Sequence, residues 1–288
     1  MFRKKTKKAI VLDVDGVIIG EKKGVNTPHP HPDVMNCLRQ ICANGIPIVL
    51  CTAKPAFGIE YEIREAKLNN PHIADGGGLL VDNEGKVYKK FILDSDLAQK
   101  IVARLLEMNV YTEVYTTDDY YIQSSQEGDI TDKHAFVLQR RPQIVSSLVD
   151  FCKENEVTKI MQVVDDESFK PFGEEVFSPF AANASMIWAI HPPILPLQFG
   201  IITALGISKP NGVLSISEIL DVPVENMLAV GDSTSDWKFM KLCGYVGAMG
   251  NAAEELKSLV KTKGNNAIIG DTVDNNGVIG IINWYAEQ

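Results

Sequence analysis

The stretch Ile10–Ile18, which reads Ile-Val-Leu-Asp-Val-Asp-Gly-Val-Ile, decides the fold that we expect for this chain. An apolar run delivers two carboxylates, Asp13 and Asp15, and then a glycine turn. On an extended strand, residues two apart project to the same side, so both acids would stand together where the strand ends. Such an apolar strand is typical of a parallel sheet buried on both faces, and these sheets bind ligands at the carboxyl ends of their strands.

Two carboxylates this close repel one another, which limits what the pair can be. The repulsion is tolerable if a cation lies between them, or if one carboxyl stays protonated. The first option indicates a metal site, and the second indicates a general acid. A more ordinary interpretation also stays open, namely an Asp-Gly turn in which an aspartate only caps the turn.

The composition is that of a globular protein without general affinity for polyanions. The chain has 288 residues, 45% of them hydrophobic, which suffices for one large domain or two smaller ones. The formal net charge of -9 argues against nucleic acid and anionic membrane as partners. The locally basic start, Arg3–Lys8, is interpreted as a solvated tail. No apolar run resembles a signal peptide or the roughly 20 residues of a membrane span, so we expect a cytoplasmic protein.

The cysteines agree with that location. There are five, an odd number without Cys-x-x-Cys spacing, so no disulfide framework is indicated. Cys51 could be a catalytic thiol at a predicted strand end, but a buried apolar cysteine is the interpretation that we favour.

Up to residue 79 the chain alternates strands and helices. A helix that opens at Pro32 is followed by the strand Ile46–Leu50, which runs into Thr52. A strand, a crossover helix and a second strand form a parallel pair, which brings Thr52 to the sheet edge that carries Asp13. The Thr52 hydroxyl and free backbone N–H groups there, that of Ala53 included, could hold a phosphate. A helix N-cap at Thr52 is the alternative.

A second unit begins after three glycines, Gly76–Gly78, which suit a hinge. The pattern that follows predicts these elements in order: a hairpin over 79–91, a helix over 97–105, strands around 112–117 and 120–123, a helix around 144–154, and strands at 159–164 and 185–190. Pro192, Pro193 and Pro196 mark a stiff return. We therefore predict an α/β protein: a Rossmann-like parallel-sheet core at 1–79 and 194–288, with an inserted α+β cap domain at 80–193.

A second acidic strand end follows the insert. The apolar run Met227–Gly231 leads into Asp232-Ser-Thr-Ser-Asp236. Asp232 and Asp236 could complete a metal site with Asp13. Hard oxygen ligands without clustered histidines or cysteines indicate Mg²⁺ rather than zinc.

These residues resemble the haloacid dehalogenase-like phosphatases, in particular the Cof-type group, which carries a large α/β cap after its second motif. The first motif of that family, Asp-x-Asp-Gly-[Thr/Val], is matched by Asp13–Val17, and the second, a Thr or Ser at a strand end, by Thr52. The third motif, a lysine, is matched by Lys209, and the fourth, Gly-Asp-x-x-[Asn]-Asp, by Gly231–Asp236. The resemblance covers nearly the whole chain.

The resemblance implies a Mg²⁺-dependent phosphatase. Asp13 would attack phosphorus and form an aspartyl-phosphate, and Asp15 would protonate the leaving oxygen and later activate water. Mg²⁺ would be held by the Asp13 carboxylate, the Asp15 main-chain carbonyl and Asp232.

The substrate side of the site is implied in the same way. Thr52, with Ala53 beside it, and Lys209 would bind the phosphoryl oxygens. Asp236 would bind a metal-coordinated water or orient Lys209. Ser235 is placed with the substrate-binding residues, although it stands where the family usually has Asn and so keeps a donor but loses reach.

Two more positions depart from the family pattern, and two more segments agree with it. Lys54 stands where Arg often follows the Thr, and Asp75-Gly76-Gly77 stands where Asn-Gly-Ala is common. Residues 247–252 and 275–278 are similar to that group's closing segments. No departure removes the nucleophile, the acid, the lysine or the metal acids, so we expect activity.

The expected activity is hydrolysis of a small-molecule phosphate ester, a sugar or polyol phosphate, by a monomer or homodimer. Two alternatives stay open: a phosphomutase that transfers the phosphoryl group from Asp13 to a sugar hydroxyl, and a non-enzymatic phosphate-responsive regulator, which leaves the large insert unexplained. The position of the insert between Gly76–Gly78 and Pro192–Pro193 predicts a lid that excludes macromolecular substrates. A cap that serves dimerisation is the alternative to the lid.

Overall fold

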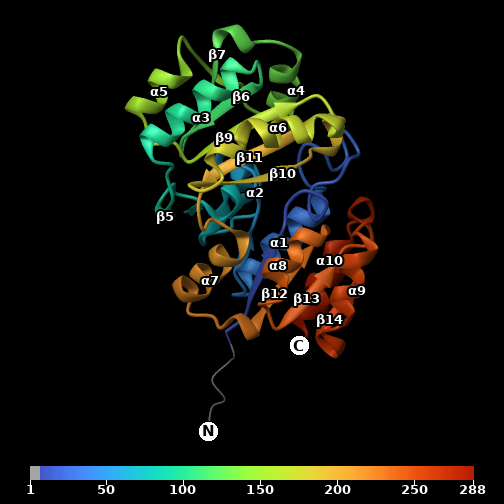
Figure 1. The fold of residues 1–288 in the computed structure, drawn as a ribbon. Helices are drawn as coiled ribbons and strands as arrows, with labels where there is room; N and C mark the ends of the chain where they lie inside the picture. Colours follow the sequence, from blue (N-terminus) through green and yellow to red (C-terminus); the bar gives the residue numbers. More distant parts are fainter. Residues whose placement is uncertain (1–6) are drawn as a thin grey trace. The chain divides into compact units, whose positions relative to one another are not determined.

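The computed structural model describes residues 7–288, so most of the basic tail predicted at Arg3–Lys8 lies outside the described residues. The chain divides into two compact units. Unit 1 is built from the chain up to Ala53, from Ile59–Tyr88 and from Ser208–Gln288, and unit 2 from Lys54–Gly58 and Lys89–Ile207 (Figure 1). Within the described part of the chain, no helix is both long and apolar enough to cross a membrane.

Unit 1 is organised around a parallel sheet. Its strands, in spatial order, are β14 (Ala267–Ile269), β13 (Tyr245–Ala248), β12 (Met227–Gly231), β1 (Ala9–Leu12) and β2 (Ile48–Leu50). Neighbouring strands are parallel throughout. All residues of β1 are fully buried, which explains the unbroken apolar sequence of this central strand. The predicted Rossmann-like α/β class is confirmed.

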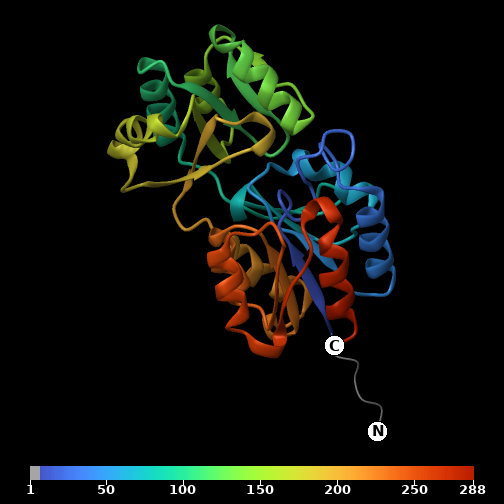
Figure 2. The same cartoon turned by 90° about the vertical axis from the view of Figure 1, so that its right-hand side faces the viewer.

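Helices cover both faces of this sheet. They are α1 (Pro32–Ala43), α2 (Glu60–Glu65), α7 (Lys209–Leu220), α8 (Trp237–Met240), α9 (Glu254–Lys261) and α10 (Gly277–Ala286). Helix α1 contacts α10, whereas α8 contacts both α7 and α9, and Figure 2 shows α10 and α9 on opposite sides of the sheet. Helix α1 begins at Pro32 because proline fits the first turn, and it buries Val34, Leu38 and Ile41 against the core.

A small second sheet lies mainly in unit 1, with the end of its last strand in unit 2. Its strands, in order, are β3 (His72–Ala74), β4 (Leu79–Val81) and β5 (Val87–Lys90). The buried His72 ring joins β3 to the main sheet: its Nδ1 accepts a hydrogen bond from the Leu50 N–H (3.1 Å), and its Nε2 lies 3.2 Å from the Leu68 carbonyl oxygen. Because an amide only donates and a carbonyl only accepts, these partners select a neutral ring with its proton on Nε2.

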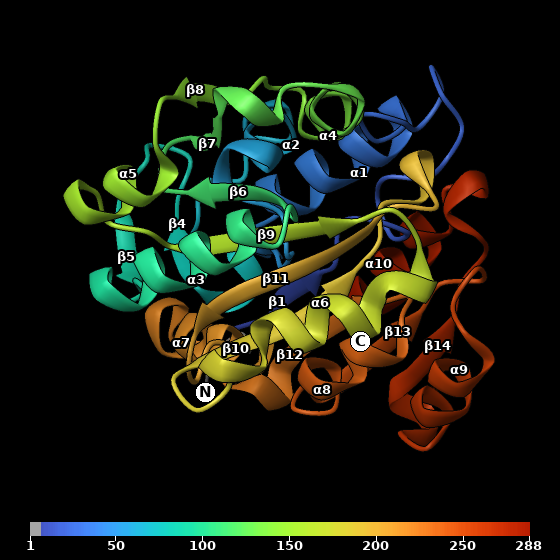
Figure 3. The same ribbon diagram turned by 45° about the horizontal axis from the view of Figure 1, so that its top comes forward.

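Unit 2 is an α+β domain on a mainly antiparallel sheet, as predicted. Its strands, in order, are β10 (Ala184–Ala189), β11 (Gln198–Ala204), β9 (Lys159–Val164), β6 (Tyr111–Tyr115), β7 (Tyr120–Gln123) and β8 (Gln143–Val145). Its helices are α3 (Ser95–Glu107), α4 (Asp129–Leu138), α5 (Leu148–Glu154) and α6 (Lys170–Phe177). Only β7 and β8 pair in parallel. Helices α3, α5 and α6 pack on one face of the sheet and bury a separate apolar core (Figure 3).

The boundaries of unit 2 differ from those predicted. Strand β11 was not expected, yet it pairs with both β10 and β9, so the unit runs to Ile207 instead of ending at residue 193. At the other end β4 pairs with β3, so unit 1 keeps the chain up to Tyr88 and unit 2 continues from Lys89 instead of starting at residue 80.

Helices of unit 2 also differ from the prediction, which contained neither α4 nor α6. The helix predicted over 144–154 begins at Leu148, because Ile144 lies in β8 and the Ser147 hydroxyl accepts the hydrogen bond of the Asp150 N–H (3.1 Å) as an N-cap. Helix α4 was not predicted, since polar and charged residues interrupt its apolar positions.

Candidate active site

The turn after β1 places the first acids. The Asp13 N–H donates to the Val230 carbonyl (3.0 Å), which continues the pairing of β1 with β12 to the end of the strand. Gly16 then has a φ of +77°, and a Cβ at this position would lie 2.0 Å from the Asp232 Oδ2. The turn that contains Asp15 can therefore lie against Asp232 only because residue 16 is a glycine.

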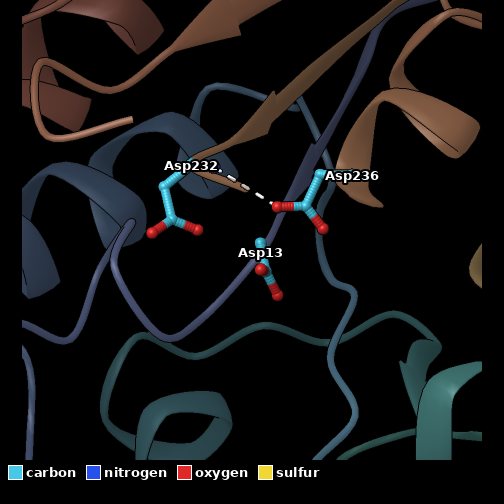
Figure 4. A group of neighbouring side chains, drawn as sticks. All are labelled: Asp13, Asp232 and Asp236. Atoms are coloured by element: carbon cyan, nitrogen blue, oxygen red, sulfur yellow. Dashed lines mark hydrogen bonds between the residues drawn. The ribbon is translucent and has the colours of Figure 1, made fainter. Parts of the chain in front are cut away.

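Three carboxylates gather at the carboxyl ends of β1 and β12. Asp13, Asp232 and Asp236 each offer one oxygen, and these oxygens lie within 4.8 Å of one another (Figure 4). The dashed line in Figure 4 marks the hydrogen bond that the Asp232 N–H donates to the Asp236 Oδ2 (3.3 Å). The structure thus brings together the acids that the sequence placed at two separate strand ends.

Lys209 lies between two of these acids. It is the first residue of α7, and its Nζ lies 3.0 Å from the Asp13 Oδ1 and 2.8 Å from the Asp236 Oδ1. Gly77 makes room for the start of this helix: its φ is +107°, and a Cβ there would lie 2.3 Å from the Ser208 carbonyl oxygen. The glycine turn interpreted as a hinge therefore packs directly against the residue that precedes the lysine.

Asp236 is held by a network that the sequence analysis did not identify. Its Oδ2 accepts hydrogen bonds from the Ser233 N–H (3.1 Å) and from the Ser233 hydroxyl (3.0 Å). Although burial opposes it, these bonds and the ammonium of Lys209 hold the pKa of Asp236 below its usual value. The Ser-x-x-Asp spacing at 233–236, typical of a capping box, is the signal that could have identified Ser233.

The other two acids are destabilised as anions. Burial, with the nearby charge of Asp236, raises the pKa of Asp13 well above its usual range, although Lys209 opposes the shift. Burial and Asp236 raise the pKa of Asp232 to about 7. Since three carboxylates face one ammonium, the group has an excess of negative charge in a low-dielectric setting. A hard divalent cation such as Mg²⁺ fits this donor set because it would offset that charge with oxygen ligands alone.

The segment at Thr52, which we expect to bind phosphate, is only partly as predicted. The Thr52 N–H donates to the Ile73 carbonyl (2.9 Å), and the Thr52 carbonyl accepts from the Gly76 N–H (2.9 Å). The Thr52 N–H is therefore not among the free backbone donors expected at this strand end, because it is bonded to β3. The N-cap alternative is also wrong, since the next helical turn begins only at Ala56. The buried Thr52 hydroxyl and the Ala53 backbone stay the candidates.

The remaining predicted residues lie around the three acids. Asp15 is half-buried in the turn and outside the group of three, but its charge contributes to the raised pKa of Asp232. Ser235 is exposed, and its Oγ lies 2.7 Å from the Ser233 Oγ. Cys51 is fully buried, and burial raises the pKa of its thiol, which argues against a catalytic thiolate.

The family model and the relatives that match this chain indicate the same class of enzyme. A family model described as haloacid dehalogenase-like hydrolase matches residues 10–282. Phosphatase YwpJ of Bacillus subtilis (strain 168) is 25% identical over 275 residues, which cover 88% of this chain and 92% of the relative. The 5-amino-6-(5-phospho-D-ribitylamino)uracil phosphatase YwtE of the same organism is 24% identical over 278 residues, 90% of this chain and 94% of the relative.

A solved structure agrees in fold. The crystal structure of a haloacid dehalogenase-like hydrolase from Bacteroides thetaiotaomicron has a TM-score of 0.79 and 22% identity, and the match covers 97% of this chain and 99% of that one. The match to the family model spans both acidic strand ends, Thr52 and Lys209. This chain belongs to the haloacid dehalogenase-like hydrolases.

Proposed function

We propose that this chain is a Mg²⁺-dependent phosphatase that hydrolyses small phosphate esters, sugar or polyol phosphates in particular, through an aspartyl-phosphate on Asp13. The observation that carries the proposal is the gathering of Asp13, Asp232 and Asp236 at the ends of two paired parallel strands, with Lys209 in contact with two of these acids. Family membership supports hydrolysis. Both relatives are named as phosphatases, and the name of YwtE specifies a phosphorylated ribityl compound, which supports a phosphate ester of polyol character.

Asp13 is the nucleophile in this proposal. The Lys209 ammonium contacts its Oδ1 at 3.0 Å and so orients the carboxylate, with Oδ2 as the attacking oxygen. A bond forms between Oδ2 and phosphorus while the bond from phosphorus to the leaving alcohol breaks, and Asp15 gives its proton to the leaving oxygen. Asp15 then takes a proton from water as the water oxygen attacks phosphorus, which releases inorganic phosphate and regenerates Asp13.

The first step brings two anions together, so it needs positive charge. Mg²⁺, held by the Asp13 carboxylate, the Asp15 carbonyl and Asp232, would supply most of it. Lys209 contributes an ammonium whose position is fixed by Asp236. The Thr52 hydroxyl and the Ala53 N–H would bind phosphoryl oxygens, and each such donor stabilises the charge that develops in the transition state.

Hydrolysis of 4-nitrophenyl phosphate tests the proposal. We expect phosphate release that needs Mg²⁺, stops on exhaustive chelation and returns when Mg²⁺ is added back. Asp13→Asn should abolish turnover, whereas Asp33→Asn, the same change at an exposed residue of α1, should leave it unchanged. Undiminished turnover after chelation would exclude the metal, and activity in Asp13→Asn would exclude the covalent step. Phosphoryl transfer to an added sugar without release of inorganic phosphate would indicate a mutase instead.

A further inference from the structure

Asn251 connects two distant parts of unit 1. It lies between β13 and α9, in the segment 247–252 that the proposed mechanism does not use. Its side-chain Nδ2 donates a hydrogen bond to the Gly16 carbonyl (2.9 Å), and its Oδ1 accepts one from the Val273 N–H (2.8 Å). Both polar groups of the amide therefore form hydrogen bonds, and the one from Nδ2 reaches the turn that contains Asp15.

The Gly16 turn is sensitive to such a contact. The Gly16 N–H donates to the Ile19 carbonyl (2.8 Å), so the turn is closed by its own backbone on one side. On the other side Gly16 lies so close to the Asp232 carboxylate that a Cβ would meet it at 2.0 Å. A shift of the Gly16 carbonyl therefore moves the residue next to Asp15 and changes the contact with Asp232.

The backbone of the same loop holds the second acidic turn. The Ala253 N–H donates to the Asp232 carbonyl (3.1 Å), and the Met249 N–H donates to the Gly231 carbonyl (3.2 Å). The loop 249–253 thus contacts the acidic turns after β1 and after β12. Its side-chain contact with the first turn is made by the Asn251 amide.

We propose that Asn251 is a positioning residue for Asp15: by holding the Gly16 carbonyl it keeps the turn after β1 at the distance from phosphorus that proton transfer to the leaving group requires. The inference rests on the proposed phosphatase function and adds a residue to it. An amide suits the task because it binds a carbonyl without adding a further negative charge beside the acids of the two turns. Small errors of position reduce the rate of a chemical step steeply.

The two hydrogen bonds of Asn251 can be separated by substitution. Asn251→Ala removes both. Val273→Pro removes only the hydrogen bond that the Asn251 Oδ1 accepts from the Val273 N–H. Proline fits the backbone at this position because Val273 is the first residue of a 3-10 turn and Thr272 before it is extended. Asn251→Asp keeps the shape and the acceptor for Val273 but loses the donor to Gly16. If the contact with Gly16 positions Asp15, both Asn251 variants should lose activity toward esters whose leaving group needs a proton, and Val273→Pro should keep it.

The readout is leaving-group selectivity, which a merely structural role would not change. The enzyme is assayed with 4-nitrophenyl phosphate, whose leaving group departs readily as an anion, and with phenyl phosphate, whose more basic leaving group needs the proton of Asp15. We expect Asn251→Ala and Asn251→Asp to lower kcat/KM for phenyl phosphate by about 10-fold, and for 4-nitrophenyl phosphate by about 2-fold or less. Hydrogen exchange of the peptide covering 14–20 should be faster in both variants than in Val273→Pro.

Each result decides the inference. Equal losses of kcat/KM on both substrates in the Asn251 variants would overturn it, and so would the same selectivity change in Val273→Pro. A hydrogen-exchange rate of the peptide 14–20 in Asn251→Ala equal to that of the wild type would also overturn it. If Asn251→Ala does not fold, judged by its thermal unfolding, Asn251→Asp carries the test alone. If the wild-type enzyme hydrolyses neither ester, the proposed function has failed, which is distinct from an active wild type whose Asn251 variants keep their selectivity.

Discussion

Lys209 brings a positive charge to the group of three acids in unit 1. Its ammonium contacts Asp13 and Asp236, and the side chains of all three residues are at least four-fifths buried. Burial alone would lower the pKa of the lysine, but the two carboxylates raise it, so the side chain stays charged. Removing one partner of a buried charge group is costly because the remaining charges are left in a medium of low dielectric.

We therefore predict a double effect of Lys209→Met. The free energy of unfolding should fall by about 3 kcal/mol in the absence of Mg²⁺, and kcat should fall by about 10²-fold or more because a donor to the phosphoryl group is lost. Urea unfolding and the aryl phosphate assay measure the two effects. Lys257→Met is the matched control, since Lys257 pairs with a Glu254 side chain that is 87% exposed, and its loss should cost less than about 1 kcal/mol. Equal costs for the two variants would contradict the prediction.

At this scale the sequence predicts the acids better than the groups that hold them. Asp13, Asp232 and Asp236 stand out because each follows an apolar strand, and parallel pairing of those strands brings their ends together. Ser233 is indicated only by its Ser-x-x-Asp spacing to Asp236, and the contact of Asn251 depends on a loop conformation that carries no periodic signal. The hydrogen bond from the Thr52 N–H to Ile73 was missed for a related reason, because it forms only when β3 lies beside β2. The chemical roles of these residues stay predictions.

At the scale of the elements, His72 is a pH-sensitive joint between β2 and β3. Burial is the main cause that lowers its pKa from 6.5 to about 4. The geometry explains why protonation is resisted: the ring Nδ1 faces the Leu50 N–H, so a second proton would place two donors against each other. The strand that ends at Thr52 is thus fixed to β3 by a neutral histidine.

This joint predicts a loss of stability in acid. The unfolded chain takes up the His72 proton near pH 6.5 and the folded chain only near pH 4. The contribution of His72 to the free energy of unfolding is therefore complete above pH 6.5 and decreases as the pH falls toward 4. From this residue alone the free energy of unfolding should be lower by about 2 kcal/mol at pH 5 than at pH 7.5. Urea unfolding at both values, for the wild type and His72→Asn, isolates the effect. An equal decrease in both proteins would refute it.

The elements themselves were predictable where their apolar pattern is strong. The predicted strand at 159–164 coincides with β9, and α1 begins at the predicted Pro32. Strand β11 was missed because the nearby prolines suggested that the insert had already ended, whereas its pairing with β9 and β10 is a long-range property. A strand assignment of this kind needs the partner strands to be known.

At the scale of the whole molecule, each unit has its own apolar core. The buried residues around β1 and β12 all belong to unit 1, and those packed against α3 and α5 all belong to unit 2. The three acids and Lys209 are likewise all residues of unit 1. We propose that the insert acts as a lid which selects small esters and is not needed to hold the metal.

Excision of the insert tests this division. In a chain with Lys89–Ile207 replaced by a short Gly-Ser linker, we expect Mg²⁺ affinity, measured by calorimetry, to stay within about 3-fold of the wild type, because the proposed ligands are retained. The preference for a small sugar phosphate over a phosphorylated protein, measured as a ratio of kcat/KM values, should decrease. An excised chain that unfolds cooperatively but no longer binds Mg²⁺ would contradict the first expectation. Unchanged discrimination would contradict the lid, and loss of a dimer on size-exclusion chromatography would favour a role in assembly.

The central position of β1 has a consequence for biosynthesis. The ribosome makes β1 early, but one of its two neighbours, β12, pairs Ala9 with Met227 and is made only after the whole stretch Lys89–Ile207. The second core can therefore form on the nascent chain while one edge of β1 still lacks its partner. A product that terminates before Met227 carries Asp13 without Asp232 and Asp236, and it exposes an apolar strand edge of the kind that promotes aggregation. Translation of the last strands thus closes the sheet and assembles the three acids in one event, so the group cannot form on a truncated polypeptide.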